Sequence, residues 1–344
     1  MALSKMKTVI TVFGASIILL MGIVAYFFFG DNVANNNQPL VVKIGKESKM
    51  EALKSQILNK TVLHNNVSFR FVAWFMGLED ASIQTGRYEF PPSTNNFKLV
   101  RYILKGRQTP IKLTFNNVRT FEELSGELGR QLLLDSTELL QYFLSEQTLQ
   151  EIGLNKNQVL SLFIPNTYDL YWTISVKDLK EKMIAEHDKF WKKEGRIAKA
   201  DSLTLSKAEI YTLASIVEKE TNFLAERRRL AGVYLNRLSS GMKLQADPTV
   251  VFALGQFDLK RVLFEHLRYD NPYNTYMYEG LPPGPICMPS IHAIDAVLNA
   301  ESHDYLFFCA KIGYAGEHVF TKTLKEHATV ANAYREWLNK EGIK

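Results

Sequence analysis

The sequence carries little net charge and shows neither internal repeats nor a long low-complexity segment. Lys and Arg number 41 against 36 Asp and Glu, a net charge of +5, and the basic residues form no stripe interleaved with aromatics. Nucleic-acid binding is therefore disfavoured, although an anionic polymer is compatible with this charge. Hydrophobic residues make up 46% and charged residues 22%, which is ordinary for a globular protein. A length of 344 residues allows about two domains.

Cysteine is scarce, and no familiar metal-binding spacing occurs. The two cysteines, Cys287 and Cys309, could pair in an oxidising compartment or stay as buried free thiols, and sequence alone leaves both open. His318 and His327 lie nine residues apart, with a glutamate beside each, and match no recognised zinc motif. We therefore predict neither a metal site nor a cofactor.

A long uncharged run near the N-terminus is the clearest localisation signal. Residues 8–30 contain no charged side chain, and about 20 apolar residues suffice to cross a bilayer. A cleaved signal peptide, with its shorter apolar region and small-residue cleavage site, is the alternative. Because Lys5 and Lys7 precede the run and Asp31 follows it, the positive-inside rule places the N-terminus in the cytoplasm. The rest is then extracytoplasmic, in the periplasm if the source is Gram-negative.

Hydrophobic periodicity divides the remaining chain into three parts. The pattern over 40–110 predicts strand, helix, helix, strand and a further helix, which describes a small α/β module. The next part is mainly helical around "LFIPNTYDLYW", predicted as a buried loop or strand, and the last contains "GLPPGPICMPS", which cannot be helix or central strand. The predicted boundaries are a tail at 1–7, a transmembrane helix at 8–30, a linker at 31–39, the module at 40–110, a helical connecting region at 111–200 and a C-terminal domain at 201–344.

One helix of the C-terminal domain carries an unusual carboxylate. In "SKAEIYTLASIVEKET", Ser206 and Glu209 form a capping box, which predicts that a helix begins directly after Ser206. At about 100° per residue, Glu220 falls within the apolar stripe around Leu213. Glu218 falls at about 140° from the centre of that stripe. We therefore expect Glu218 to be solvated and its replacement to leave most of any activity.

A carboxylate on an apolar helix face is costly unless it is paired or protonated. Desolvation raises the pKa of such a group and keeps its proton near neutral pH, and a general acid needs that state. Glu220 is therefore the candidate acid. Two structural alternatives stay open: the helix ends before Glu220, or one of the arginines at 227–229 pairs with it.

Four segments of the C-terminal half resemble one family of enzymes. They are "ASIVEKET", "VYLNRLSSGMKLQADPTV", "NPYNTYMYEGLPPGPI" and "HVFTKTLKEH". The first is similar to the active-site helix of lytic transglycosylases and goose-type lysozymes, in which Glu-Ser follows an aliphatic pair; Glu220 and Thr221 take that place. Together the segments resemble the endolytic murein transglycosylases of the MltG (YceG-like) type. With the anchor and the module, the match covers nearly the whole chain.

The resemblance implies an α+β chain with a transmembrane helix, a small LysM-like module and a mainly helical lysozyme- or transglycosylase-like catalytic domain. It implies a lyase that cleaves the β-1,4 bond between N-acetylmuramic acid (MurNAc) and N-acetylglucosamine (GlcNAc) in nascent peptidoglycan. Glu220 would act as general acid and then base, closing a 1,6-anhydro ring without water. The implied location is the cell inner membrane, single-pass, with the catalytic domain in the periplasm. The implied partners are glycan strands, the membrane and peptidoglycan synthases.

The resemblance also indicates residues that would contact the glycan. Thr221 matches the small hydroxyl residue after the acid, and Asp247 is the one other acid expected to have a catalytic or orienting role. Each candidate also has a structural interpretation, such as a helix-end cation, a turn or loop packing. The predicted substrate-binding residues are Thr221, Asn236, Arg237, Gln245, Asp247, Thr249, Tyr273, Asn274, Thr275 and Tyr276.

The sequence departs from the family pattern in one segment, and three functions stay open. Where the family has Phe-Pro-Asp-Thr-Tyr, this chain has Ile164 and Asn166 in "IPNTY". The LysM-like module is expected either to bind GlcNAc-containing chains or to act as a spacer. Besides a transglycosylase, the alternatives are a non-catalytic peptidoglycan-binding or scaffold protein and a muramidase that uses water, usually with a second carboxylate.

Overall fold

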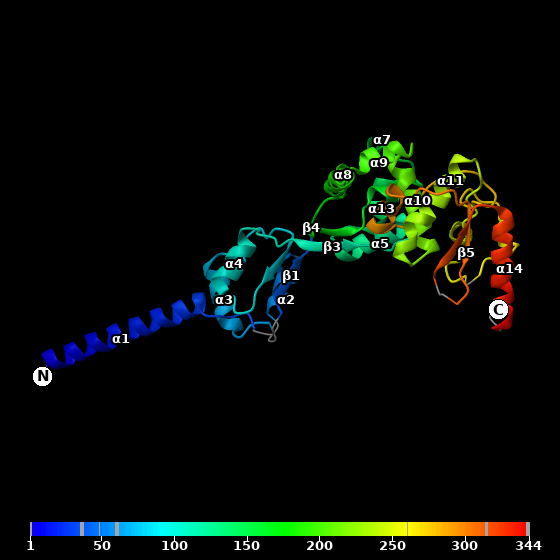
Figure 1. The fold of residues 1–344 in the computed structure, drawn as a ribbon. Coiled ribbons are helices and arrows are strands. Elements are labelled where there is room, and N and C mark those ends of the chain that lie inside the picture. Colours follow the sequence, from blue (N-terminus) through cyan, green and yellow to red (C-terminus); the bar gives the residue numbers. More distant parts are fainter. Residues whose placement is uncertain are drawn as a thin grey trace. The chain divides into compact units, whose positions relative to one another are not determined.

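The chain forms helices and small two-stranded sheets, which confirms the predicted mixture of helix and strand. The structure is a computed structural model, and it describes residues 2–34, 38–47, 49–58, 62–259, 261–313 and 316–341 (Figure 1). Its backbone packing separates two compact units. The first unit is Met1–Leu113 with Gln131–Leu133 and Tyr168–Ile174, and the second is Thr114–Arg130, Leu134–Thr167 and Ser175–Lys344.

The first unit begins with the long helix α1 (Ala2–Phe29) and continues into a small module. The stretch Lys5–Phe29 is long and apolar enough to cross a membrane. In the module, β1 (Leu40–Ile44) pairs antiparallel with β2 (Gly86–Phe90). The predicted order of strand, helix, helix and strand is confirmed. The helices of the module are α2 (Lys49–Ile57), α3 (Asn66–Phe75) and α4 (Asn96–Leu104).

The residues that follow α1 are paired with this module. Asp31 forms an antiparallel bridge with Asn95, and Val33 forms another with Leu63. Val33 is buried in the hydrophobic core of the module. Of the predicted linker at 31–39, the first residues are therefore held by backbone pairing, and 35–37 lie outside the described residues.

The second unit is mainly helical, and α10 (Lys207–Glu220) packs against three of its other helices: α11 (Arg227–Ser239), α12 (Asp247–Leu254) and α13 (Ile291–Leu298). The predicted Ser206 capping box is present, and α10 begins at the next residue. The other helices that the structure describes after the module are α5 (Phe121–Gln131), α6 (Ser136–Phe143), α7 (Glu146–Ile152), α8 (Val176–Lys192), α9 (Arg196–Ser202) and α14 (Leu324–Lys340). Short 3-10 helices lie at η1 (Val159–Leu162), η2 (Leu224–Glu226) and η3 (His266–Arg268).

Two further two-stranded sheets and an ordered loop complete the fold. β3 (Ile111–Phe115) pairs with β4 (Asn166–Leu170), which confirms a strand within "LFIPNTYDLYW". β5 (Phe307–Ala310) pairs antiparallel with β6 (His318–Thr321), and α14 packs against both. The proline-rich segment at 280–290 is neither helix nor strand, as predicted, and its residues 286–288 are nearly fully buried.

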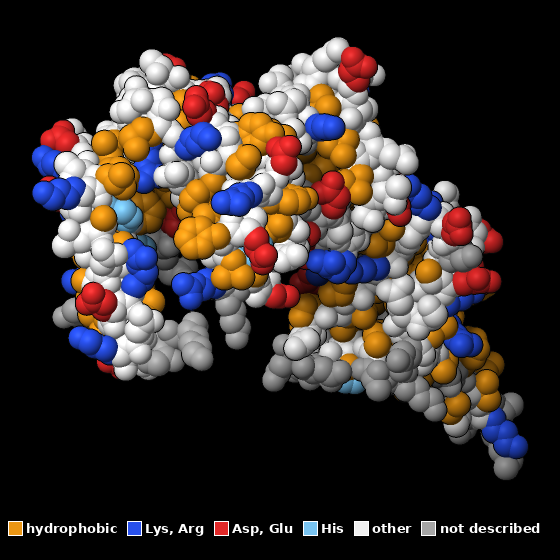
Figure 2. All heavy atoms as spheres, turned by 90° about the vertical axis from the view of Figure 1, so that its right-hand side faces the viewer, with side chains coloured by type: hydrophobic (Ala, Val, Ile, Leu, Met, Phe, Trp, Pro, Cys, Tyr) orange, Lys and Arg blue, Asp and Glu red, His pale blue; other side chains and the backbone are white. Residues whose placement is uncertain are grey.

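The structure also settles the state of the two cysteines and the surface charge on one face. Cys287 is buried, Cys309 is partly buried, and both are free thiols. Figure 2 shows Lys and Arg side chains interspersed with acidic and apolar ones, and the described residues of that face form no continuous basic band.

Candidate active site

Glu220 is the last residue of α10, where the helix leaves the core of the second unit. All residues from Ile210 to Val217 are buried, and Thr221 is extended, with φ −142° and ψ 135°. The Glu220 side chain therefore projects from a firmly packed helix into the space beside α11 and α12. Its Oε1 accepts a hydrogen bond of 2.6 Å from the hydroxyl of Tyr234 on α11. Tyr234 is itself fully buried, which fixes the position of the donor.

Burial makes Glu220 a weak acid in the range where enzymes use general acids. Desolvation raises the pKa of its carboxyl group to about 7, against an ordinary value of 4.5. The hydrogen bond from Tyr234 and the charge of Arg237 lower this pKa, because both favour the carboxylate, whereas the negative charge of Asp247 raises it. The net result is a carboxyl group that holds its proton up to neutral pH and can also release it.

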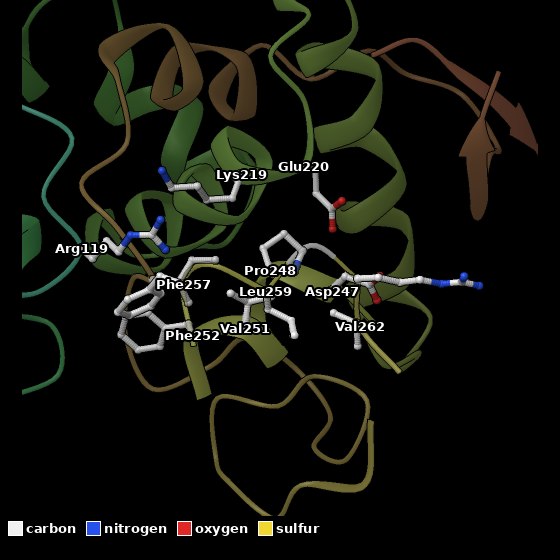
Figure 3. Close-up of a pocket in the computed structure, with 12 residues that line it drawn as sticks. Arg119, Lys219, Glu220, Asp247, Pro248, Val251, Phe252, Phe257, Leu259 and Val262 are labelled. Carbon is white, nitrogen blue, oxygen red and sulfur yellow. The ribbon is translucent and has the colours of Figure 1, made fainter. Parts of the chain in front are cut away.

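Two adjoining cavities meet at this carboxyl group, because Glu220 and Asp247 line both of them. One has a volume of about 410 Å³ and extends toward Arg119, Phe252 and Phe257. Figure 3 shows the Glu220 carboxyl group directed toward Asp247 and Pro248, with Arg119 and the two phenylalanine rings at the opposite end. The second cavity has a volume of about 350 Å³. Its lining residues are Glu220, Arg237, Gln245, Asp247, Tyr276, Phe307, Phe308, Leu324 and His327.

We call the two adjoining cavities together the groove. Four of the predicted substrate-binding residues line its second cavity together with Glu220: Arg237, Gln245, Asp247 and Tyr276. Asp247 is the first residue of α12, and its Oδ1 accepts a hydrogen bond of 2.6 Å from the Tyr276 hydroxyl. The Arg237 guanidinium is held by the carbonyl oxygens of residues 244 and 306, at 2.6 and 2.7 Å. The groove is therefore lined by one acid of raised pKa, Glu220, and by one carboxylate that accepts a hydrogen bond, Asp247.

Other predicted residues support the groove from beneath. Thr249, Asn274 and Thr275 are 0–1% exposed, and their side chains bond within the protein. The Thr249 and Thr275 hydroxyls lie 2.8 Å apart, and the Asn274 amide donates to two loop carbonyls. Because burial leaves these three side chains no contact surface, the structure assigns them to loop packing rather than to the groove wall.

The remaining predicted residues lie beside the groove. Thr221 is 3% exposed, accepts a hydrogen bond from the amide of Phe223 and donates one to the carbonyl of Gly316. The Asn236 amide donates to two backbone carbonyls of the segment before β5. Tyr273 packs its ring on Phe252, with ring centroids 4.7 Å apart, at the edge of a third cavity.

The prediction that Glu218 is solvated is wrong. Its carboxylate forms an ion pair of 2.8 Å with Arg227 and accepts a hydrogen bond of 2.6 Å from Ser290, the N-cap of α13. The Glu218 side chain is only 18% exposed and that of Arg227 only 6%. Glu218 does point away from the groove, but α11 and α13 cover that side of α10, and helical periodicity cannot reveal this.

The structure also excludes the two structural alternatives that the sequence left open for Glu220. The helix does not end before Glu220, since α10 includes it. The three candidate arginines have other partners: Arg227 binds Glu218, Arg228 donates to the carbonyl of Asn299, and Arg229 binds Glu301. Glu220 is thus held by a neutral tyrosine, and its pKa rises as burial predicts.

Several groove residues were missed in the sequence. Tyr234 lies in "VYLNRL" on a different helix, 14 residues from Glu220, and nothing in the pattern distinguishes it from a core tyrosine. Arg119 comes from a segment more than 130 residues before Phe252 and Phe257, which lie close together in the chain. Asn166, which departs from the family pattern, is exposed at the start of β4.

The histidines considered for metal binding have other contacts. His318 Nδ1 lies 3.0 Å from a carboxylate oxygen of Glu226, and the His327 ring stacks on Phe307. In the part of the chain that the structure describes, no three His, Cys, Asp or Glu side chains come together as a metal site.

A sheltered acid, a tyrosine donor and a second carboxylate around one groove are the groups that acid–base chemistry requires. The chain belongs to the YceG-like family, whose model matches residues 42–333, and the resemblance inferred from the motifs is confirmed. It is 39% identical over 160 residues to the endolytic murein transglycosylase of Bacillus subtilis (strain 168), which covers 46% of this chain and 43% of that protein. Over 309 residues it is 26% identical to the endolytic murein transglycosylase of Streptococcus pneumoniae serotype 2, covering 81% of this chain and 55% of the other.

The chain therefore spans about half the length of the curated relatives it matches. Among solved structures, a YceG-like protein from Listeria monocytogenes aligns with a TM-score of 0.57 at 28% sequence identity. That alignment covers 86% of this chain and 99% of the other, so that the architecture extends across almost all of the Listeria protein.

Proposed function

We propose that this chain is a membrane-anchored endolytic lytic transglycosylase that cleaves the β-1,4 MurNAc–GlcNAc bond of nascent peptidoglycan. The observation that carries the proposal is Glu220, a carboxyl group with a pKa raised to about 7 where two cavities meet. Family membership and the names of the relatives support peptidoglycan as the substrate class.

In this proposal Glu220 moves a single proton twice. The protonated carboxyl group gives its proton to the glycosidic oxygen as the bond to C1 of MurNAc breaks, and the GlcNAc 4-hydroxyl leaves. The resulting carboxylate then removes the proton from the C6 hydroxyl of MurNAc, whose oxygen attacks C1 and closes the 1,6-anhydro ring. Glu220 ends protonated, and no water is consumed. A pKa near the working pH suits a group that must both donate and accept.

The groove offers suitable contacts for such a substrate. Phe252 and Phe257 present apolar faces on which sugar rings can stack, and Arg119 lies over the Phe257 ring at 4.1 Å. Arg119 and Lys219 also supply positive charge for the carboxylates of muramyl stem peptides. The carboxylate of Asp247 is positioned to stabilise the positive charge that develops on the sugar.

The anchor, the module and the partners complete the proposal. The apolar helix α1 supports single-pass anchoring in the inner membrane. In this proposal the N-terminus is in the cytoplasm and the catalytic domain is on the periplasmic side. The helical core of that domain would be lysozyme-like. The βααβ order of the module supports a LysM-like role, either in binding glycan or as a spacer. Peptidoglycan synthases would supply the nascent strands.

Asp247 supports one other function, a muramidase that uses water. It lines both cavities with Glu220, so the second carboxylate that water activation usually needs is present across the groove. The two reactions differ in their products. Mass spectrometry of uncrosslinked peptidoglycan digested by the full chain should reveal 1,6-anhydroMurNAc ends. Reducing MurNAc ends would establish the muramidase instead. Intact strands would indicate a non-catalytic binding protein.

Replacing Asp247 with Asn should slow cleavage about 10²- to 10³-fold without changing the product, because electrostatic stabilisation weakens while the Glu220 proton relay stays complete. The rate and the end groups are measured together by mass spectrometry. Asp270→Asn is the matched control, since Tyr278 donates to Asp270 at 2.6 Å in the same way, but that pair lines neither cavity. Complete loss of cleavage by Asp247→Asn would favour the muramidase.

Replacing Tyr234 with Phe should move the alkaline limb of the pH profile of kcat/KM to higher pH. Cleavage needs protonated Glu220 in the free enzyme, so kcat/KM falls as pH rises through the Glu220 pKa of about 7. The Tyr234 hydrogen bond lowers that pKa, and its removal therefore raises it. Tyr211→Phe is the control, because Tyr211 is equally buried but donates to the carbonyl of Phe163. A limb that moves to lower pH, or does not move, would contradict the assignment.

A further inference from the structure

Helix α3 of the first unit has a buried apolar face, and its outer face carries exposed apolar side chains beside Arg70. Phe69, Val72 and Ala73 are buried in the core of the module. On the opposite side, Val67 is 69% exposed and Trp74 is 67% exposed. Clusters of exposed large apolar side chains commonly mark sites that contact another protein or a membrane. The outer face of α3 therefore needs an explanation, because exposing a tryptophan and its apolar neighbours to water is unfavourable.

This outer face continues directly into the end of α1. The Phe28 ring lies 5.3 Å from the Phe75 ring and 6.4 Å from the Phe71 ring, and Phe71 also contacts Trp74. Phe29 contacts Phe97 of α4 at 5.6 Å. Figure 1 shows α3 and α4 beside the end of α1. We call the following set the aromatic collar: Phe27, Phe28, Phe29, Phe71, Trp74, Phe75 and Phe97.

Buried hydrogen bonds fix α1 to the module at this point. The Asn96 amide donates to the carbonyl of Phe27 at 2.9 Å, and the Asn32 amide donates to the Asn96 side chain at 2.7 Å. Asn32 and Asn96 are 2% and 1% exposed. Because buried amides are costly to leave unpaired, these bonds hold the end of α1 in a set position against α3 and α4. A bilayer around α1 would therefore meet the collar.

The charges around the collar suit a lipid surface. Arg70 on α3 and Lys98 and Arg101 on α4 are exposed, and the Arg101 guanidinium lies 5.6 Å from the centre of the Phe97 ring. Tryptophan is enriched at both membrane–water interfaces, where its ring enters the headgroup layer, and exposed basic side chains beside it can contact lipid phosphates.

We propose that α3 lies in the membrane interface, with the aromatic collar in the headgroup layer and the neighbouring basic residues on anionic lipids. This inference rests on the proposed anchoring of α1. The module then has two membrane contacts, the spanning helix α1 and the interfacial helix α3. Two contacts hold the module at a fixed position on the bilayer surface, whereas one contact would let it reorient.

The test uses the full chain in vesicles of phosphatidylcholine and phosphatidylglycerol that carry lipids brominated near the headgroup end of the acyl chain. Bromine quenches tryptophan fluorescence only at short range. The fluorescence of Trp74 is the difference in tryptophan fluorescence between the natural chain and Trp74→Phe. We expect the brominated lipids to quench most of this fluorescence. The same difference for Trp191→Phe is the control, because Trp191 is 1% exposed within the second unit and should not be quenched.

Two outcomes would overturn the proposal, and flotation of the vesicles distinguishes them. If the chain floats with the vesicles but Trp74 is not quenched, α1 anchors the protein and α3 does not touch the lipid. If the chain does not float, the anchor itself fails, and the interfacial contact fails with it. Glycan cleavage by the same samples reports on the proposed activity independently of both.

Discussion

Replacing Glu220 with Gln should abolish glycan cleavage and leave the fold intact. The amide keeps the shape of the protonated acid and can still accept the hydrogen bond from Tyr234, but it has no proton to transfer. General acid–base catalysis typically contributes a factor of about 10² to 10⁴, so the rate should fall by at least about 10²-fold. Release of soluble fragments from uncrosslinked peptidoglycan measures the rate, and the urea midpoint reports on the fold.

Glu181→Gln is the matched control for this experiment. Glu181 is an exposed glutamate of α8 and lines neither of the two groove cavities, so this change removes one carboxylate with no expected effect on cleavage. A Glu220→Gln protein that keeps more than about a hundredth of the wild-type rate would show that another group donates the proton.

Replacing Glu218 with Ala should produce the largest loss of stability among the changes considered. It leaves the guanidinium of Arg227 buried without its carboxylate and removes the acceptor of the Ser290 hydroxyl. Breaking a buried pair on one side costs several kcal/mol; because Glu218 keeps some contact with water, we expect about 2–4 kcal/mol. Urea unfolding measures the lost free energy of unfolding, and hydrogen exchange at the α10 amides shows whether the loss falls on that helix.

Glu301→Ala provides the comparison for an exposed pair. Glu301 and Arg229 are 42% and 41% exposed, and such surface pairs contribute less than about 1 kcal/mol. Equal costs for the two changes would contradict the structural role of Glu218. Because Glu218 fixes the end of α10 two residues before Glu220, we also expect its loss to reduce cleavage, which revises the expectation drawn from the sequence.

The difference between Glu218 and Glu220 shows what a sequence can reveal about this site. The capping box at Ser206 and the apolar stripe depend on residues close in sequence, and they placed the start of α10 and the inward position of Glu220 correctly. The partners of both glutamates come from elsewhere: Tyr234 and Arg227 lie on α11, and Ser290 lies 72 residues beyond Glu218. Helical periodicity gives a direction around one helix but not what packs there.

The predicted substrate-binding residues fall into two groups, those that line the groove and those buried beneath it, and the sequence pattern does not separate the two. Asp247, Tyr276 and Thr275 stand in similar polar segments, yet Asp247 and Tyr276 face the groove while Thr275 bonds to Thr249 beneath it. A hydroxyl or amide side chain suits a sugar contact and a loop hydrogen bond equally well. Burial decides between the two, and burial depends on how α12 and the loop before the proline-rich segment fold together.

The most direct test of the account is the protonation of Glu220 itself. Infrared difference spectra between the natural chain and Glu220→Gln, recorded as a function of pH, isolate the carboxyl stretch of this one group. We predict a protonated carboxyl band that persists into neutral solution and is lost with a midpoint of about pH 7. A midpoint near 4.5, the ordinary value for glutamate, would show that water reaches the group freely and that it is carboxylate at neutral pH.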